Sequence, residues 1–485
     1  MANPILYEIN TRVWRHRFGE DTRLLDIPFA YWQQLAALGV EYVWLMGVWQ
    51  TGPNVLHYAL ESGLQEAYRQ ALPDWTERDI IGSPYAIDRY VLHPDLGLPE
   101  DLPLLRQRLN DCGLRLLLDF VPNHFHAESG YVSSHPDVFL EVSQDALEKD
   151  SHTFYQPPGL GGRVFAHGKD PWFAAWQDTA QVNYTHPAAQ AFMLEQLLHI
   201  AAQCDGVRCD MAMLPLPQVM AQTWGAYLGA ASGQTPAFWP KAIQTVRSQH
   251  PGFLFLAEVY WDMEWQLQQM GFDYTYDKRL RDRLSHTDAE GVRNHLLAER
   301  AFQERSTRFL ENHDEERSLR ELNISQAQAA ALIAYTVPGM RFFYQGQWEG
   351  RRIRLPVQLG REPLETSTSS HGLALSGIPL AKLTRLQSVV PSMTAFYDFL
   401  LQLLRESLLQ EGQWVLLPAQ HPSHIAWQWV LDGQRVYIGV NYGNQPFAIQ
   451  LPPSVSGWRA YLTSQPIDAT VFLVAFEWVV AVDTL

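Results

Sequence analysis

The feature that most constrains the fold of this chain is a recurring unit: a short, continuously apolar run, then a polar cluster, then an amphipathic stretch of helical period. Runs without polar alternation are typical of parallel strands that are covered on both faces. The apolar runs lie at 41–46, 114–120, 204–210, 252–258 and 307–312. The helical patterns lie at 28–38, 102–111, 187–203, 240–250 and 325–335. This alternation favours an α/β fold, either a closed barrel or a doubly wound sheet.

Two departures from the regular spacing divide the chain. Far more residues separate Asp119 from Asp210 than one strand–helix unit needs, and the excess contains the loop signals PPGLGG and HGKDP. We interpret this excess as a small domain inserted after the third strand. Beyond about residue 410, short β-rich runs are separated by turn residues, a pattern typical of an antiparallel β-sandwich. These runs lie at 413–417, 424–430, 435–441, 446–451, 458–463 and 471–480, after a helical stretch at 380–409.

We therefore predict an α/β fold with three units. The first is a (β/α)8 TIM barrel at 1–120 and 185–390, which is large enough to carry a catalytic site. The second is a small domain inserted at 121–184. The third, at 391–485, consists of a helix and a C-terminal antiparallel β-sandwich.

The composition excludes several classes of partner. The 485 residues include 36 Lys and Arg against 52 Asp and Glu, which gives a formal net charge of −16. A field of this sign repels nucleic acid and anionic membranes, and it suits a neutral ligand such as a sugar. The first residues contain no signal-like segment and no late apolar run is long enough to span a bilayer, so we expect a cytoplasmic protein. The sequence leaves the oligomeric state open.

Four polar clusters stand where apolar runs end. They are DFVPNH at 119–124, RCD at 208–210, EVYW at 258–261 and ENHD at 311–314. The carboxyl ends of all strands of a parallel barrel open onto one face, so these clusters would converge there. Converging carboxylates raise one another's pKa, a cost that is typical of sites for acid/base or nucleophilic chemistry. One cluster alone would indicate an ordinary strand end, but four clusters in order favour catalysis.

Cleavage of a glycoside requires converging carboxyl groups of this kind. One carboxylate attacks the anomeric carbon, and a second carboxyl protonates the leaving oxygen and later activates water. Arg208 stands two residues before Asp210, so the strand period places both side chains on the same face of the barrel wall. The sequence thus predicts catalytic carboxyl groups that lie beside the positively charged side chain of Arg208.

The chain resembles the alpha-amylase superfamily of retaining α-glycosidases and transglycosylases over about residues 1–350. The family's four ordered motifs resemble DFVPNH at 119–124, GVRCD at 206–210, AE at 257–258 and FLENHD at 309–314. QVN at 181–183 is similar to the family's short motif in the inserted domain. SPY at 83–85 is similar to the segment whose Tyr stacks on the sugar at the cleavage point.

The resemblance implies a role for each matching residue. Asp210 is implied to be the nucleophile, Glu258 the general acid/base, and Asp314 the stabiliser that grips hydroxyls of the distorted ring. Asp119 is expected to pair with Arg208 in a supporting role. The residues implied to bind substrate are Tyr85, His124, Arg208 and His313.

The chain also departs from the family's pattern. The second motif commonly continues with Lys-His, but Met213 and Leu214 stand at those places. Asn123 matches the position of a calcium ligand in amylases, whereas the Asp of the inserted-domain motif is Gln181. Calcium prefers six to eight oxygen ligands, so we predict no calcium site, no other metal and no cofactor.

A basic cluster follows the expected eighth strand. One interpretation is that Arg351, Arg352 and Arg354 bind an anion such as phosphate near the active face. Pairing with nearby acids such as Glu349 and Glu362 is the favoured interpretation, because runs of charge are usually solvated and paired.

Aromatic side chains offer a further signal, since 17 residues are Trp. Packing in the core is the default for most of them, because aromatic residues dominate burial. Trp172 and Trp261 follow motif segments, so we predict that these two are exposed and stack on sugars.

The leading hypothesis is a retaining glycoside hydrolase that cleaves α-glucosidic bonds of a maltodextrin-like or short glucoside substrate by double displacement. The alternative is a transglycosylase or phosphorylase, in which another hydroxyl or phosphate captures the same covalent intermediate. The catalytic residues are common to both, because the choice of acceptor lies in loops. A non-catalytic sugar-binding relative is disfavoured, because Asp210, Glu258 and Asp314 are all present.

Overall fold

The computed structural model describes residues 3–53, 55, 57–228, 236–365, 392–454 and 456–483. Eight parallel strands close a barrel in chain order, and the last strand pairs with the first in the register Ile5↔Arg341. The strands are β1 (Ile5–Asn10), β2 (Val40–Met46), β5 (Arg115–Phe120), β11 (Gly206–Cys209), β12 (Leu254–Ala257), β13 (Tyr274–Tyr276), β14 (Ser306–Arg308) and β15 (Met340–Tyr344). The predicted barrel is confirmed.

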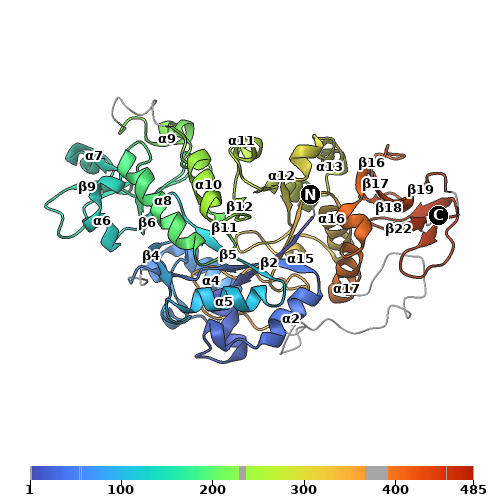
Figure 1. Ribbon diagram of the computed structural model, residues 1–485, viewed down its shortest axis with the longest axis horizontal. Coiled ribbons are helices and arrows are strands. Elements are labelled where there is room, and N and C mark those ends of the chain that lie inside the picture. The colour runs from blue at the N-terminus through green and yellow to red at the C-terminus, as the bar shows by residue number, and fades with distance from the viewer. Residues whose placement is uncertain are drawn as a thin grey trace.

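Helices surround the barrel (Figure 1). The predicted helical ranges correspond, within two residues at either end, to α2 (Phe29–Ala37), α5 (Asp101–Asn110), α8 (Pro187–Ala201), α10 (Phe238–Gln249) and α16 (Ile324–Thr336). The start of α16 is fixed by a capping box between Asn323 and Gln326, which satisfies backbone donors at the helix end. The other helices between barrel strands are α1 (Thr11–Trp14), α9 (Pro217–Trp224), α11 (Glu264–Gln269), α12 (Lys278–Ser285), α13 (Ala289–Leu296), α14 (Arg300–Gln303) and α15 (Ser318–Glu321).

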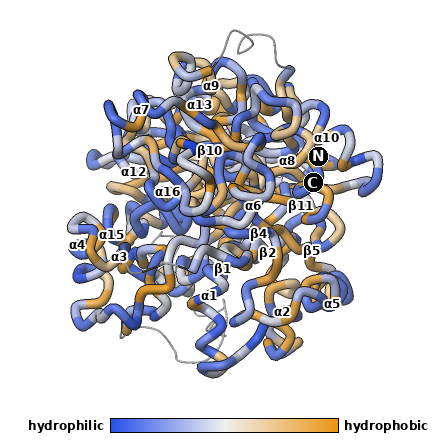
Figure 2. The backbone as a smooth tube through the Cα atoms, turned by 90° about the vertical axis from the view of Figure 1, so that its left-hand side faces the viewer, coloured by the Kyte–Doolittle hydropathy of each residue, from blue (hydrophilic) through white to orange (hydrophobic). Residues whose placement is uncertain are grey.

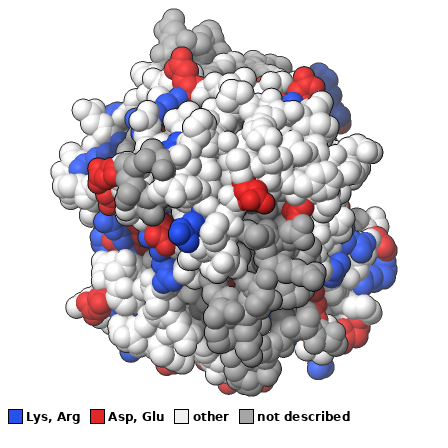
Figure 3. Space-filling view, turned by 90° about the vertical axis from the view of Figure 1, so that its right-hand side faces the viewer, with Lys and Arg blue, Asp and Glu red and all other residues white. Residues whose placement is uncertain are grey.

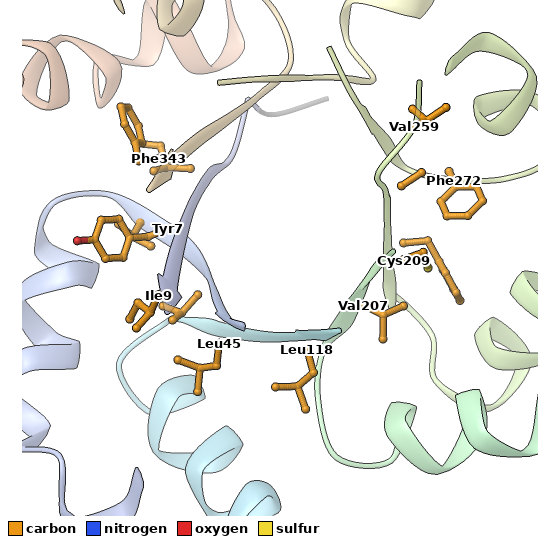
Figure 4. Packing of buried hydrophobic residues seen from close by; sticks show 14 of the residues in the cluster. Tyr7, Ile9, Leu45, Leu118, Val207, Cys209, Val259, Phe272 and Phe343 are labelled. Atoms are coloured by element: carbon orange, nitrogen blue, oxygen red, sulfur yellow. The ribbon is translucent and has the colours of Figure 1, made fainter. Parts of the chain in front are cut away.

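The two faces of each barrel strand belong to different cores. In β1, Tyr7 and Ile9 pack outward against the helices, whereas Leu6 belongs to the cluster inside the barrel. Figure 4 shows such outward side chains between the strands and the helices, and Figure 2 shows that β5 is mainly hydrophobic along its length. Burying one such side chain contributes about 1.5–3 kcal/mol. Because the period is two, Glu8 in β1 and Arg208 in β11 point into the barrel.

An inserted segment follows the third barrel strand, as the sequence predicts, and lies at the left of Figure 1. It contains β6 (His124–His126), α6 (Gly130–Ser134), β7 (Glu141–Val142), α7 (Gln144–Lys149), β8 (Phe154–Tyr155), β9 (Val164–Ala166) and β10 (Thr179–Gln181). β6 and β10 pair antiparallel in the register His124↔Gln181. This pairing places the segment beside the carboxyl end of β5.

The connection from β2 to β4 forms a second excursion that the periodic pattern does not predict. We call residues 47–92 the wall segment; it contains β3 (Trp49–Thr51), α3 (His57–Leu60), α4 (Ser62–Ala71) and β4 (Ile87–Leu92). Tyr68 and Ala71 on α4 share an apolar cluster with Leu355 and Leu359, which follow β15. The wall segment is thereby packed against the chain that leaves the last barrel strand.

The C-terminal unit lies at the right of Figure 1, beyond α17 (Met393–Leu404) and α18 (Ser407–Glu411). Its antiparallel sheets are β16-β17-β18-β22-β20 and β19-β21. These strands are β16 (Gln413–Leu416), β17 (His424–Leu431), β18 (Gln434–Asn441), β19 (Phe447–Gln450), β20 (Arg459–Ala460), β21 (Thr470–Leu473) and β22 (Trp478–Asp483). The predicted run at 471–480 is divided between two strands, because Phe476 takes a φ of 56° in a turn.

The helical stretch predicted at 380–409 lies partly outside the described residues, and α17 and α18 occupy its remainder. The domain boundaries given above stay predictions. On the face of the C-terminal unit shown in Figure 3, positive and negative side chains are scattered among uncharged ones. None of the helices in the described part of the chain has the length and apolar character needed to cross a bilayer.

Candidate active site

The polar clusters found in the sequence lie together at the carboxyl ends of the barrel strands. They border a cleft of about 1010 Å³ between the wall segment and the inserted segment. Arg208 and His313 lie beneath its floor, with residue exposures of 0% and 1%. The predicted site residues that line the cleft are Tyr85, His124, Asp210, Glu258 and Asp314.

Arg208 is the centre of the buried charge cluster. Its Nη1 atom lies 2.6 Å from Asp210 Oδ1 and 3.8 Å from Asp119 Oδ1, and its Nη2 atom lies 2.9 Å from Glu258 Oε2. The expected pairing of Asp119 with Arg208 is therefore present, as the longest of these contacts. Aromatic rings enclose the guanidinium and favour its charge; they belong to Trp44, Tyr85 and Tyr276.

The Glu258 carboxyl is buried and held at both oxygens. Met211 donates its backbone N–H to Oε2 at 2.7 Å, and the Tyr260 hydroxyl donates to Oε1 at 2.9 Å. Burial raises the pKa of Glu258 to about 7, although Arg208 opposes the shift and Asp210 adds to it. A carboxyl in this environment can carry a proton near neutral pH, as the sequence interpretation requires of a proton donor.

The Asp210 carboxylate sits closest to Arg208. Burial raises its pKa, while the Arg208 charge and hydrogen bond act in the opposite direction. Two neighbouring carboxyls thus share one cation but differ in their second contacts, because Glu258 also accepts from Tyr260 and Met211. An arrangement of this kind separates the roles of a nucleophile and a proton donor.

His313 links the third carboxylate to the inside of the barrel. Its Nδ1 atom lies 2.5 Å from Glu8 Oε1, and its Nε2 atom lies 3.0 Å from Asp314 Oδ2 and 2.8 Å from the Tyr85 hydroxyl. Burial disfavours the His313 cation, but Asp314 and Glu8 outweigh it and raise its pKa well above the usual value. His313 thus holds Tyr85 and Asp314 in place from below the cleft.

The position that matches a calcium ligand in the family carries a different contact here. The Gln181 amide nitrogen lies 2.9 Å from Asn123 Oδ1, 3.1 Å from the Asn123 carbonyl and 3.0 Å from the Val182 carbonyl. Three surrounding oxygens fix this amide as the donor. An N–H group aimed at the candidate oxygens repels a cation, so these residues do not fit a calcium ion.

Two arginines of the basic cluster after β15 are paired with acids. Arg351 lies 3.1 Å from Glu362, and Arg354 lies 3.3 Å from Glu316. Arg352 donates to a main-chain carbonyl. The pairing interpretation is supported, with Glu362 among the partners as expected.

An aromatic pair lies near the cleft on the side of Glu258. Trp172 in the inserted segment is 64% exposed, and its ring centroid lies 6.5 Å from that of Trp261. Trp261 and Asp262 have φ values of 62° and 60°, a left-handed conformation that costs free energy for such residues. The strained turn presents the half-buried Trp261 ring toward Trp172.

The sequence interpretation missed Glu8, Met211 and Tyr260. Glu8 had a visible signal, because it is the one acidic residue in β1 and alternates with the apolar Tyr7 and Ile9. Tyr260 lies within the motif EVYW at 258–261, but its place there indicates no role. The Met211 contact uses a backbone N–H group, which side-chain identity does not reveal.

Comparison with known proteins agrees with this geometry. The family model described as "Alpha amylase, catalytic domain" matches residues 33–353. Alpha-amylase MalA of Haloarcula japonica is 25% identical over 76% of this chain and 49% of its own length. Alpha-amylase 3 of Dictyoglomus thermophilum is 25% identical over 57% of this chain and 56% of its own length. The chain thus spans about half the length of these curated relatives.

The fold is also found in solved structures. The trehalose-6-phosphate hydrolase of Bacillus licheniformis superimposes with a TM-score of 0.70, covering 100% of this chain and 99% of that chain at 13% identity. At this level of identity the similarity concerns the fold, including the C-terminal unit.

Proposed function

Because this chain belongs to the alpha-amylase family of glycosyl hydrolases, we propose that it cleaves α-glucosidic bonds with retention of configuration. The proposed substrate is a maltodextrin-like or short α-glucoside. The observation that carries the proposal is the contact of both Asp210 and Glu258 with the Arg208 guanidinium. One guanidinium holds the two carboxyls close, which supports the separation of about 5–5.5 Å of retaining enzymes over the wider spacing of inverting ones.

In the first proposed step, Asp210 Oδ attacks the anomeric carbon while the bond to the leaving oxygen breaks. Glu258 gives its proton to that oxygen, so the leaving sugar departs as a neutral alcohol. The protein then carries a glycosyl ester on Asp210 and an ionised Glu258. Arg208 keeps the Asp210 carboxylate ionised and oriented, while the negative charge of Asp314 stabilises the positive charge that develops on the distorted ring.

In the second proposed step, Glu258 takes a proton from water as the water oxygen attacks the anomeric carbon. The ester bond breaks, and its electron pair returns to Asp210 as a carboxylate. Two displacements at one carbon restore the original configuration. Both carboxyls end in the protonation states in which they began.

Hydrolysis is favoured over transfer to phosphate by the charges of the cleft. No Lys or Arg is found among the described residues that line it, and the nearby Arg351 and Arg354 are engaged by acids. A phosphate acceptor would meet a carboxylate-rich surface, and the buried Arg208 beneath it is already engaged by Asp210 and Glu258. Transfer to a sugar hydroxyl keeps the same intermediate, and product analysis with and without phosphate distinguishes these outcomes.

The test uses the proton donor. We expect Glu258→Gln to lose most activity on maltooligosaccharides, which have poor leaving groups, but to keep the first step with α-glucosyl fluoride. Water attack then lacks its base, so added azide should restore turnover of the fluoride. Equal loss on both substrates without azide rescue would show that the acid/base lies elsewhere.

A further inference from the structure

A side-chain contact in the cleft joins the wall segment to the inserted segment. The Tyr58 hydroxyl of α3 donates a hydrogen bond to Asp178, which directly precedes β10. Both residues line the same cleft as the catalytic carboxyls. The contact therefore joins two excursions that leave the barrel after different strands.

Both partners of this contact are held in place. Tyr58 is 6% exposed, His57 packs on its ring with centroids 3.8 Å apart, and Gly82 lies so close that an added Cβ would come within 3.3 Å of the ring. The Asp178 carbonyl accepts a 2.8 Å hydrogen bond from the backbone of Ala127. Because Tyr58 and Asp178 are both held in place, their contact forms a rigid wall at this side of the cleft.

The position of this wall within the cleft follows from its neighbours. Tyr58 interacts with the main chain of Ser83, two residues before Tyr85, and the charge of Asp178 acts on His124. Tyr85 and His124 are the residues expected to contact the sugar that becomes bound to Asp210. We call this side of the cleft the glycon end, because Glu258, the proposed proton donor to the leaving oxygen, assigns the leaving sugar to the side of Glu258 and Tyr260.

The leaving-group side contrasts with the glycon end. Phe173 lines the cleft and is 70% exposed, and the neighbouring Trp172 is 64% exposed. Side chains with this exposure leave room for a sugar chain to run out into solvent. At the glycon end, by contrast, the cleft is bordered by the buried Tyr58 and its contact with Asp178, and Leu60, Glu61 and Leu64 line the cleft beside them.

We propose that the Tyr58–Asp178 contact closes the glycon end, so that the enzyme acts from the nonreducing end of short α-glucosides. The Asp178 carboxylate also offers an acceptor for the free hydroxyl that marks a chain end. An internal sugar has a glycosidic bond at that hydroxyl, and its continuing chain would meet the wall. The inference rests on the proposed function and names the substrate class of the same site.

The experiment compares two substrates. One is a nitrophenyl α-maltoheptaoside with a free nonreducing end, and the other is the same compound blocked there by an ethylidene acetal. We expect the wild-type protein to degrade the free compound and to act on the blocked one roughly 100-fold more slowly, the scale on which a closed pocket discriminates. Chromatography of the products should show release of short sugars from the nonreducing end.

Variants test whether this contact is the determinant. Tyr58→Phe removes only the hydroxyl, and Asp178→Ala removes its acceptor; each should raise the ratio of blocked to free activity about tenfold. Asp178→Asn keeps an acceptor oxygen and should raise it less. Tyr68→Phe is the matched control, because Tyr68 lies on α4 outside the cleft and its hydroxyl has no hydrogen-bond partner within the described part of the chain.

Each possible result supports or overturns the proposal that the Tyr58–Asp178 contact closes the glycon end. Rapid wild-type cleavage of the blocked compound would overturn the closed end while leaving α-glucosidic cleavage intact. A ratio that stays low in both Tyr58→Phe and Asp178→Ala would overturn the role of the contact. Failure to cleave either compound would instead overturn the proposed function, and the inference with it. If a variant does not fold, the wild-type comparison still tests the closed end.

Discussion

Two buried charge clusters in the same barrel have opposite balances. At the carboxyl end of β11, one cation, Arg208, faces Asp210, Glu258 and Asp119. After β13, one carboxylate, Asp277, receives Arg308 and lies 2.8 Å from His295 Nε2. The first cluster has several carboxyls around one cation, whereas the second has two basic partners around one carboxylate.

The pKa values follow this balance. Burial tends to raise the pKa of every carboxyl in both clusters, but His295 and Arg308 outweigh it and lower the pKa of Asp277 to about 2. Around Arg208, one cation is shared, and the pKa of Glu258 rises to about 7. A cluster with surplus partners fixes its carboxylate as a permanent charge, whereas a cluster with too few leaves a proton that can move.

The largest expected difference between the clusters comes from replacing one carboxylate in each. Asp210→Asn should reduce kcat by roughly 10⁴-fold or more, because an amide does not form the glycosyl ester. Its melting temperature should stay near that of the wild type, since the substitution also relieves repulsion among carboxyls. Near-normal activity in a pure sample would contradict the assignment of the nucleophile.

Asp277→Asn should lower the stability of the protein and leave its activity largely unchanged. It leaves the buried Arg308 without its carboxylate, so we expect a loss of about 3–5 kcal/mol in the free energy of unfolding. Denaturant unfolding measures that loss, and the remaining folded protein should keep most of its activity per molecule. If Asp277→Asn left stability unchanged but abolished catalysis, the distinction between the two clusters would be wrong.

The pH dependence should separate the clusters next. Activity should fall as pH rises through about 7, because Glu258 must carry a proton for the first step. Its raised pKa also means that its contribution to stability is present below the usual value of about 4.5 and is lost as pH rises through about 7. For Asp277 the contribution is present above about 3.8 and is lost as pH falls through about 2.

Melting temperatures measured across pH check these signs. In Glu258→Gln the loss of stability between about pH 4.5 and 7 should shrink relative to the wild type, and in Asp277→Asn the acid loss should shrink. Altering the charged groups that contact Arg208 should change the pH at which activity is lost on the alkaline side. If that pH stays the same, Glu258 is not the group that causes the loss.

A smaller effect is expected at the edge of the catalytic cluster. Glu8→Gln keeps an acceptor for His313 Nδ1 but removes the charge that supports the imidazolium, so the pKa of His313 should fall. We expect kcat to drop about tenfold and the alkaline limb of the pH profile to move to lower pH. Glu264→Gln is the matched control, because Glu264 is a buried carboxyl with a pKa raised to about 7 outside the cleft. If the pH profiles of Glu8→Gln and Glu264→Gln were equal, Glu8 would have only a packing role.

The smallest effect is expected at the contact between Asn123 and Gln181, which belongs to neither charge cluster. The Asn123–Gln181 contact is a neutral hydrogen bond, so chelator treatment should leave activity and melting temperature nearly unchanged. Activity and thermal unfolding measured before and after dialysis against EDTA provide the check. A large loss that calcium restores would show that a cation binds despite the amide.

Much of the site was predictable because strand chemistry is local. The period of two places Arg208 and Asp210 on one face of β11, and the order of the polar clusters identifies the strands that bring Glu258 and Asp314 to the same end of the barrel. The same reasoning predicts the ends of α2, α5, α8, α10 and α16 within two residues. Strands β1 and β13 were missed, because polar residues interrupt the apolar pattern of β1 and β13 spans only Tyr274–Tyr276.

By itself, the sequence determined the barrel and the family and pointed to the carboxyls that we propose to act, since these depend on periodicity and on ordered motifs. Only the tertiary structure decided that Glu8 supports His313 and that Tyr58 meets Asp178. Each of these contacts joins segments far apart in the chain. No local period relates such positions, because the distance between them is set by how the strands close and how the excursions pack.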